Sequence, residues 1–267
     1  MLVKKVSVSN ELIRAVQQLS LNEKRLLMLA VSSLDDTAGI GQLVTVSADT
    51  YSHFYGIPKN NTYRTLKEAE SKLWDRDLLM PQVDGAVTIR WIISYRYNEG
   101  RGSVSLKFHP DLDKHIINLK NRFTRYLLSR AADFSYLYSW RLFELVIQFR
   151  STGVLNISVE EFKAVMEVPK AYDHDFGLVR RKVIELAIQE IREKDGLDIS
   201  YETTKTGRKI TGLKFTFPQE KTEQTKATPV PKPNTGKRPK VDKTYIEQHA
   251  RPGETWEQAT ERLRSGS

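Results

Sequence analysis

The chain of 267 residues combines a hydrophobic fraction of 39% with a charged fraction of 28%, a balance that is typical of folded soluble domains. It contains no cysteine, which excludes a disulfide scaffold and a Cys-ligated zinc site and is compatible with a reducing cytoplasm. Residues 1–10 lack a signal-peptide core, and no apolar run approaches the roughly 20 residues that a membrane span needs. We therefore expect a cytoplasmic protein that does not contact a membrane.

The formal net charge is +9 and the sequence pI is about 9.5. Residues 1–120 hold 16 Lys and Arg against 13 Asp and Glu, residues 121–217 hold the same numbers, and residues 218–267 hold 10 against 7. The positive charge is thus spread over the whole chain and is not confined to a tail. This distribution favours a polyanionic partner such as nucleic acid. The alternative is a basic soluble protein without such a partner.

The first part of the chain predicts short helices and strands that alternate. The pattern first predicts a strand at 3–9, a helix at 11–19 capped by Asn10, and a helix that runs to residue 34 from a capping box of Ser20 and Glu23. It next predicts a strand at 43–46, a helix opened by Ser47 and ended by Gly56 to Pro58, and a helix at 60–75. Strands at 78–80, 87–97 and 103–108 follow, with a turn at 98–102.

The second part of the chain predicts a similar series. It comprises a linking segment at 111–121, a helix rich in aromatic residues at 135–149, a strand at 154–157, a helix that runs from a capping box of Ser158 and Glu161 to about Pro169, a long helix at 176–194, and a hairpin of 199–203 and 209–217 around a turn at 205–208. Proline, lysine and threonine dominate residues 218–243, which predicts a flexible linker, and residues 255–264 could form a short helix.

Residues 46–59 resemble residues 157–170 at a constant offset of 111 residues. Further along, Leu66, Ala69 and Leu73 match Ile184, Ala187 and Ile191, and each copy runs into a hairpin whose last strand contains Leu-Lys-Phe. Each copy therefore has the order helix, strand, helix, turn, helix, hairpin, which is the order of a winged helix. We predict an α+β protein with two tandem winged-helix domains, at 1–120 and 121–217, followed by a disordered basic tail at 218–267.

In helix-turn-helix proteins, the N-terminal residues of the recognition helix contact base edges, and the wing contacts the backbone or the minor groove. This rule selects the DNA-binding candidates of the second domain. Lys170, Tyr172 and His174 precede its recognition helix, Arg180, Arg181 and Lys182 lie in its first turns, and Lys205, Arg208 and Lys209 lie at the wing tip. Arg180 and Arg181 are the best candidates for base contacts, because arginine pairs bidentately with guanine.

The first domain offers an equivalent set of polar and basic residues at the start of its recognition helix and in its wing. This set consists of Lys59, Asn60, Asn61, Thr62, Arg64 and Lys67 on the helix and Arg101 in the wing. The alternative for any single member of either set is a solvated surface charge.

The sequence contains no catalytic pattern. Among His53, His109, His115, His174 and His249, no two are two residues apart, which excludes the His-x-His metal site of nucleases that nick DNA for rolling-circle replication. A phosphate-binding loop needs Gly-x4-Gly-Lys, and position 231 before Gly236-Lys237 is proline. Asp173 and Asp175 flank His174, a pattern better explained by a polar loop than by a metal site. We expect no enzymatic activity, no metal and no cofactor.

Several segments are similar to a known family, namely the iteron-binding replication initiator proteins of plasmids. The resemblance covers residues 1 to about 217 and is strongest in NELIRAVQQLSLNEKRLLMLAVSSL (10–34), VSADTYSHFYGIPKNNTYRTLKEAESKLWDRDLL (46–79), RLFELVIQFRSTG (141–153) and VIELAIQEI (183–191). It implies two winged-helix domains that bind directly repeated double-stranded DNA sites at a plasmid origin.

The same resemblance implies that monomers start replication, whereas homodimers bind an inverted repeat and repress the protein's own gene. It further implies that the first domain carries the dimer interface, that the second reads DNA most specifically, and that host helicase and other replisome proteins are recruited. Two alternatives with the same fold remain open. One is a transcriptional repressor without an initiation role, and the other is a protein whose winged helices bind protein partners.

Overall fold

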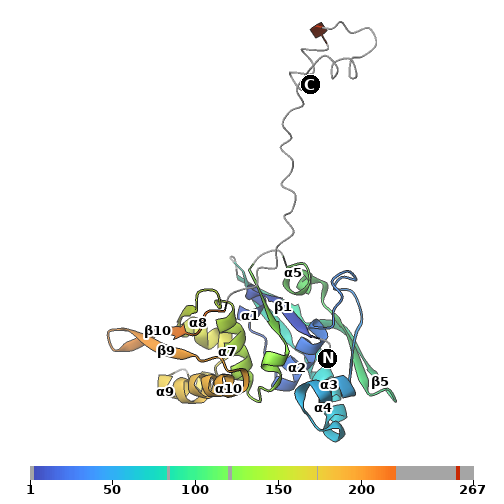
Figure 1. The fold of residues 1–267 in the computed structure, drawn as a ribbon, viewed down its shortest axis with the longest axis horizontal. Helices are drawn as coiled ribbons and strands as arrows, with labels where there is room; N and C mark the ends of the chain where they lie inside the picture. The colour runs from blue at the N-terminus through green and yellow to red at the C-terminus, as the bar shows by residue number, and fades with distance from the viewer. Residues whose placement is uncertain (1–2, 83–84, 120–121, 173, 221–256, 259–267) are drawn as a thin grey trace. The chain divides into compact units, whose positions relative to one another are not determined.

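The computed structural model describes residues 3–82, 85–119, 122–172, 174–220 and 257–258 (Figure 1). The chain divides into a compact unit, Met1–Thr222, and a second unit, Glu223–Ser267, of which Glu257 and Gln258 are described and are helical. The rest of the helix predicted at 255–264 and most of the predicted tail at 218–267 lie outside the described residues. Within the described part of the chain, no helix is long and apolar enough to cross a membrane.

The described elements up to residue 132 follow the predicted alternation of helices and strands. They are β1 (Lys5–Ser9), α1 (Asn10–Arg14), α2 (Leu21–Val31), β2 (Val44–Ser47), α3 (Ala48–Tyr55), α4 (Lys59–Trp74), β3 (Asp77–Gln82), β4 (Gly85–Arg90), β5 (Ile92–Asn98), β6 (Ser103–Phe108), the 3-10 turn η1 (Pro110–Leu112), α5 (Asp113–Ile116), β7 (Phe123–Leu127) and α6 (Ser129–Ala132).

The elements that follow form the second copy. They are α7 (Leu137–Ile147), β8 (Val154–Ser158), α8 (Val159–Met166), the 3-10 turn η2 (Lys170–Tyr172), α9 (Phe176–Val179), the π-helical turn η3 (Arg180–Ile184), α10 (Glu185–Asp195), β9 (Ser200–Thr206) and β10 (Lys209–Thr216). The helix formed by α9, η3 and α10 is the one predicted at 176–194.

The two copies have the same sheet topology. The first sheet has the strand order β2-β6-β5 and the second has the order β8-β10-β9, and all neighbouring strands are antiparallel. In each copy a helix precedes the first strand, two helices follow it, and the last two strands form a hairpin. The prediction of two winged helices is confirmed. We refer to α2 through β6 as the first winged helix and to α7 through β10 as the second.

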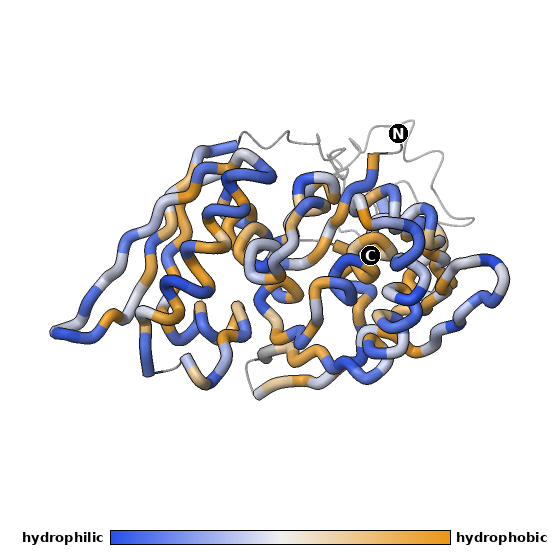
Figure 2. Tube along the Cα trace, turned by 90° about the horizontal axis from the view of Figure 1, so that it is seen from below, coloured by the Kyte–Doolittle hydropathy of each residue, from blue (hydrophilic) through white to orange (hydrophobic). Residues whose placement is uncertain are grey.

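Each winged helix buries its own apolar residues between its helices and its sheet. Leu26 and Leu73 are fully buried in the first, and Phe162, Ile191 and Phe215 are fully buried in the second. Phe162 of α8 stacks on Phe215 of β10 with ring centroids 5.7 Å apart, which fixes this helix on the sheet. Figure 2 shows that hydrophobic stretches lie on the inner helices and strands, while the tip of the β9–β10 hairpin is hydrophilic.

Local sequence signals determine several helix ends. Both hydrogen bonds of the predicted capping box are present at Ser20, whose hydroxyl accepts from the Glu23 N–H while the Glu23 carboxylate accepts from the Ser20 N–H. The Ser47 hydroxyl accepts from the Thr50 N–H at 3.0 Å and opens α3, as predicted. Gly56 ends α3 with a φ of 62°, a left-handed conformation that glycine adopts without steric cost.

The helix predicted at 11–19 is wrong in its extent and its cap. Ser9, and not Asn10, caps α1, because its hydroxyl accepts from the Leu12 N–H at 3.1 Å. The helix ends at Arg14 and Ala15 is extended, because the chain beyond it is held by the Glu167 carboxylate, which accepts hydrogen bonds from the N–H groups of Gln17 and Gln18. A tertiary contact 150 residues away along the chain thus overrides the local helix pattern.

The long strand predicted at 87–97 is also wrong. It consists of two strands, β4 and β5, which belong to different sheets and are separated at Trp91. The Trp91 side chain is fully buried, so the chain turns there to bring the indole into the core. As a result, β3 pairs with β4 in a hairpin of its own, and the wing of the first winged helix is β5–β6.

Two smaller departures concern the middle of the chain. The region after the predicted linker at 111–121 contains β7, which pairs antiparallel with β1 from Lys5↔Leu127 to Ser9↔Phe123. The division between domains at residue 120 stays a prediction.

At Ser158, half of the predicted capping box forms, because the Glu161 carboxylate pairs with Arg14 instead of with the Ser158 backbone.

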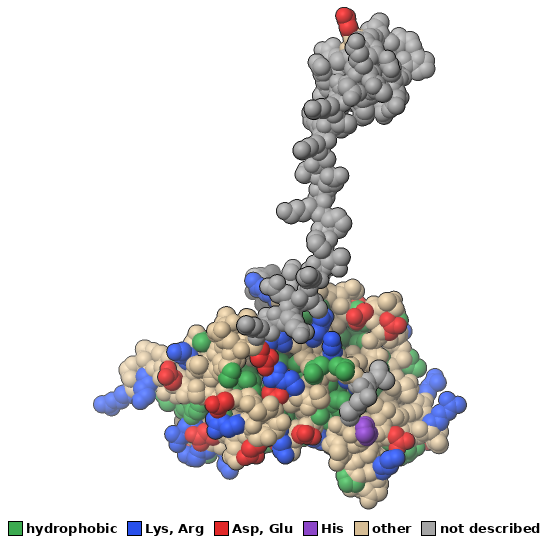
Figure 3. Space-filling view, viewed as in Figure 1, with side chains coloured by type: hydrophobic (Ala, Val, Ile, Leu, Met, Phe, Trp, Pro, Cys, Tyr) green, Lys and Arg blue, Asp and Glu red, His purple; other side chains and the backbone are tan. Residues whose placement is uncertain are grey.

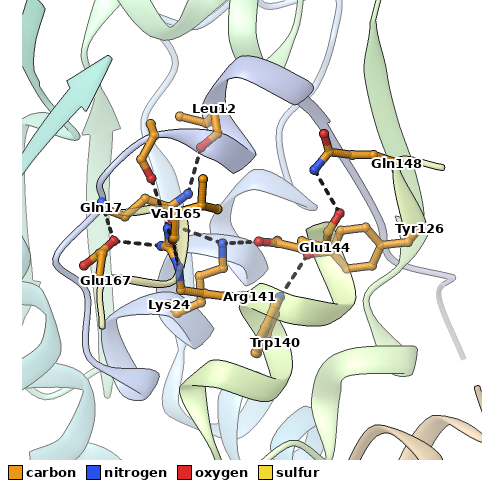
Figure 4. A network of polar contacts seen from close by, with 11 residues as sticks. Leu12, Gln17, Lys24, Tyr126, Trp140, Arg141, Glu144, Gln148, Val165 and Glu167 are labelled. Carbon is orange, nitrogen blue, oxygen red and sulfur yellow. Dashed lines mark hydrogen bonds and ion pairs between the residues drawn. The ribbon is translucent and has the colours of Figure 1, made fainter. Parts of the chain in front are cut away.

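A buried polar network joins the N-terminal segment to α7 (Figure 4). The Lys24 ammonium lies 2.8 Å from the Glu144 carboxylate, and each side chain is only 2% exposed. The same carboxylate accepts a hydrogen bond from the Tyr126 hydroxyl at 2.7 Å, and Trp140 donates to that hydroxyl at 3.1 Å. Burial lowers the pKa of Lys24, whereas the attraction of Glu144 opposes this shift.

Arg141 extends the network toward the end of α8. Its guanidinium lies 2.9 Å from the Glu167 carboxylate and donates to the carbonyl of Ala15 at 3.1 Å and to the carbonyl of Val165. Glu167 in turn holds the backbone of Gln17, as described above. The segment after α1 is therefore fixed to α7 and α8 of the second winged helix by paired charges that are removed from solvent.

Candidate nucleic-acid interface

Most of the predicted residues of the first winged helix lie on the exposed start of α4. Lys59, Asn60, Asn61, Arg64 and Lys67 are exposed. The prediction that Thr62 contacts DNA is corrected, because its side chain is fully buried and its hydroxyl donates to the Pro58 carbonyl at 3.0 Å. Its position on the core side of the helix removes Thr62 from the set of DNA-binding candidates.

The wing of the first winged helix packs directly beside α4. A Cβ atom added to Gly102 would lie 2.8 Å from the ring of Tyr63, and Gly102 has a φ of 56°, so both the space and the backbone conformation require glycine there. The turn that contains Arg101 is thereby held near the start of α4. Figure 3 shows Lys and Arg side chains grouped at this end of the molecule, on the right.

Several basic side chains of the first winged helix are already engaged with neighbours. The Lys59 ammonium lies 2.7 Å from the Asp49 carboxylate, and Arg64 lies 3.8 Å from Glu68 on the same helix. The Lys67 ammonium lies over the ring of Tyr97 at 5.1 Å. The two ion pairs are exposed and therefore weak, but they reduce the net positive charge that α4 presents to a phosphate backbone.

The second winged helix presents four of its predicted residues, His174, Arg180, Lys205 and Lys209, around one concave surface, which we call the wing groove. The other predicted residues, Lys170, Tyr172, Arg181, Lys182 and Arg208, do not line it. The two parts of the wing groove share His174 and Ile210. One part lies between α8 and β10 and is lined by Ser158, Val159, Glu160, Lys163, Ala164, Val168, His174, Lys209, Ile210 and Thr211. The other part lies between the start of α9 and β9 and is lined by His174, Asp175, Phe176, Gly177, Arg180, Tyr201, Glu202, Thr203, Lys205 and Ile210. The wing groove thus brings together Arg180, Lys205 and Lys209, which are far apart in the sequence.

The cations of the second winged helix differ from those of the first in their surroundings. Lys170, Arg181, Lys182, Lys205, Arg208 and Lys209 are exposed and make no ion pair with any residue that the structure describes. Arg180 lies 3.5 Å from Glu185, and both side chains are 49% exposed. Figure 3 shows these charges on the left, at the tip of the β9–β10 hairpin and along the adjoining helix. Unpaired cations of this kind are available to bind phosphate or base edges.

The start of the recognition helix is fixed by Asp175. Its carboxylate accepts hydrogen bonds from the N–H groups of Gly177 at 2.7 Å and Leu178 at 3.3 Å, which caps α9. A Cβ atom on Gly177 would lie 2.9 Å from that carboxylate and 3.3 Å from the Arg181 guanidinium. Asp175 therefore has a structural function, and glycine at position 177 leaves space for both the cap and the Arg181 side chain.

Some residues of the wing groove were not predicted from the sequence. They are Ser158 at the end of β8, Lys163 of α8 and Thr211 of β10. Residues on α8 could have been predicted, because α8 is the first helix of the helix-turn-helix and exposed residues of that helix face the DNA backbone in this motif. The acidic residues that line the wing groove are Glu160, Asp175 and Glu202. Acidic residues such as Glu68 and Asp75 likewise lie on or next to α4.

The fold and the wing groove together define a protein with two winged helices, the second of which exposes a basic recognition helix and wing. Comparison with known proteins gives the family. The profile described as Initiator Replication protein, WH1 matches residues 5–147, and the profile described as Initiator Rep protein, WH2 matches residues 158–217. The chain belongs to this initiator replication protein family.

Individual relatives are similar over most of the chain. A protein named PI protein from Escherichia coli is 28% identical over 255 residues, which cover 80% of this chain and 82% of the relative. A replication initiation protein from Escherichia coli is 23% identical over 218 residues, covering 78% and 67%. A solved structure of the Pi initiator protein in complex with iteron DNA has a TM-score of 0.71 and 25% identity, covering 82% of this chain and 98% of that one.

Proposed function

We propose that this chain is a replication initiator that binds repeated double-stranded DNA sites at a plasmid origin and, as a homodimer, represses its own gene. The observation that carries the DNA-binding part is the wing groove, which brings Arg180 at the start of the recognition helix together with Lys205 and Lys209 of the wing. The similar fold of the Pi initiator, which was solved with iteron DNA, supports the same assignment.

The proposal assigns different tasks to the two winged helices. The second reads the DNA site, with Arg180 and Arg181 contacting base edges and Lys205, Arg208 and Lys209 contacting phosphates. The first adds contacts from Lys59, Asn60, Asn61, Arg64, Lys67 and Arg101. The protein acts in the cytoplasm without catalysis, metal or cofactor, and it recruits host helicase and other replisome proteins to the opened origin.

DNA binding by this protein should weaken steeply as the salt concentration rises. Each phosphate that is neutralised by a lysine or arginine releases bound counterions, so the logarithm of the binding constant should fall linearly with the logarithm of the salt concentration, with a slope of about −0.9 per phosphate. Fluorescence anisotropy of a labelled origin duplex, titrated with the full chain at several salt concentrations, measures this slope. Salt-independent binding, or no binding to any origin fragment, would rule out the proposed function.

Homodimer formation is proposed to use strand β5. It lies at the edge of the sheet β2-β6-β5 and exposes Ile93 and Tyr95, which are 39% and 41% exposed. An exposed apolar edge strand can pair with the same strand of a second copy. The first winged helix, which contains this strand, is the part that the family resemblance assigns to dimer formation.

The substitution Ile93→Lys should therefore raise the dissociation constant of the dimer by at least about tenfold, because both copies would bring a charge to the paired strands. Analytical ultracentrifugation of the full chain without DNA measures this constant. Leu186→Lys is the matched control, since Leu186 is 43% exposed but lies on α10. A wild-type chain that stays monomeric at high concentration, or equal effects of the two substitutions, would contradict the assignment.

A further inference from the structure

The helix that carries Arg180 and Arg181 contains a π-helical turn. In η3, the Glu185 N–H donates to the Arg180 carbonyl, five residues earlier instead of the four of an α-helix. The equivalent helix of the first winged helix, α4, is an α-helix from Lys59 to Trp74. A π-helical turn inserts about one extra residue, so the side chains before it are rotated by about 100° relative to their positions in an uninterrupted helix.

The buried positions of the two helices show this rotation. After the turn they agree, since the buried residues Leu66, Ala69, Glu70 and Leu73 of α4 correspond to the buried residues Ile184, Ala187, Ile188 and Ile191. The same alignment pairs Arg180 with Thr62, which is fully buried. In the second winged helix, however, the buried residue is Val179, and Arg180 is 49% exposed. The π-helical turn therefore moves Arg180 out of a core position.

Tyr136, just before α7, contacts this turn. Its hydroxyl donates to the Lys182 carbonyl at 2.6 Å. This hydrogen bond places a side-chain donor on a carbonyl within the π-helical turn, where it stabilises the turn. The Glu190 carboxylate on α10 also accepts from the Tyr136 N–H at 3.2 Å and from the Ser135 N–H at 2.8 Å. Tyr136 is thus attached to the recognition helix at two points.

We propose that Tyr136 is a positioning residue for DNA recognition, whose hydroxyl stabilises the π-helical turn and thereby holds Arg180 on the exposed side of the recognition helix. The proposal rests on the proposed function, in which this arginine reads a base edge. It adds a residue that does not contact DNA but determines which side chains of the helix can do so.

Tyr136→Phe tests this inference, because it removes the hydroxyl and keeps the ring. Tyr138→Phe is the matched control, since its ring centroid lies 5.2 Å from that of Tyr136 and its hydroxyl makes no hydrogen bond with the described residues. The affinity of the full chain for a specific and a scrambled duplex is measured by fluorescence anisotropy. We expect the specific-to-scrambled ratio to fall about fivefold in Tyr136→Phe, the effect of one lost hydrogen bond, and to stay unchanged in Tyr138→Phe.

Binding to the scrambled duplex and its salt dependence should be the same in all three proteins, because the phosphate contacts do not depend on the register of the helix. If the wild-type chain discriminates between the duplexes and Tyr136→Phe does so equally well, the positioning role is refuted and the proposed function stands. If the wild-type chain itself does not discriminate, the proposed function fails.

A double-mutant cycle separates positioning from a general loss of stability. In a chain that already carries Arg180→Ala, the substitution Tyr136→Phe should cause no further change in the specific-to-scrambled ratio, because the side chain that it positions is absent. An additional fall of the same size in this background would show that Tyr136 acts by another route and would overturn the proposal.

Discussion

Glu144→Leu is expected to lower the free energy of unfolding by about 3–5 kcal/mol, because it leaves the buried Lys24 ammonium without its counter-charge. The two groups lie 2.8 Å apart and are each 2% exposed. The remaining contact of the ammonium is with the Gln17 side chain at 3.3 Å, which is neutral. Tyr126 also loses the acceptor of its buried hydroxyl. Urea denaturation of the full chain at neutral pH, followed by circular dichroism, measures the change.

Two control variants show whether the loss of stability comes from the unpaired buried charge. The double variant Lys24→Met with Glu144→Leu removes both charges and should regain most of the lost stability, since a buried ion pair can be replaced by apolar residues at little cost. Glu202→Ala disrupts the exposed pair of Glu202 and Lys214, whose charges are 3.8 Å apart, and should cost less than about 1 kcal/mol. A loss of stability in Glu144→Leu no larger than that in Glu202→Ala would contradict the structure of the network.

Arg181→Ala is expected to weaken binding to the specific duplex by about 5- to 150-fold, equivalent to 1–3 kcal/mol, if its side chain pairs with a base edge. It should also relax the preference at one base position. Lys209→Ala, on the wing, should weaken binding to all sequences nearly equally and lower the salt slope by about one unit. The contrast follows from geometry, because the start of the recognition helix faces base edges while the wing flanks the backbone.

Arg180→Ala should be measured in parallel, against specific and scrambled duplexes. Adjacent residues of a helix point in different directions, so one of the two arginines can contact a phosphate while the other reads a base. If neither substitution changes the specific-to-scrambled ratio, the reading helix has been assigned wrongly. The start of α4, with Asn60 and Asn61, would then be the next candidate.

The sequence predicted the winged helices well because short-range signals coincide with the repeat. Ser20, Ser47 and Gly56 act within one turn of helix, so their neighbours in the sequence are sufficient to define the helix ends. The internal repeat then identified the order of elements without knowledge of any contact between them. The strand order β2-β6-β5 and its counterpart β8-β10-β9 follow from that order.

The errors have a common cause, which is contact between residues far apart in the chain. The end of α1 depends on Glu167, and the pairing of β1 depends on β7, neither of which a local pattern contains. Thr62 was proposed as a DNA contact because it lies near the start of a helix, but only the position of the core decides which face it occupies. The π-helical turn at 180–184 likewise could not be predicted, because Tyr136, which contacts it, lies 46 residues before Lys182.

We expect this chain to bind repeated sites at its own origin through its winged helices. Footprinting of the full chain on the DNA that flanks its gene shows whether it does. We predict several protected direct repeats of about 20 base pairs, in phase with whole turns of the DNA helix, since each bound copy must face the same side of the duplex. Protection of a single palindrome and no repeats would indicate a repressor without an initiation role, and no protection at all would contradict the account.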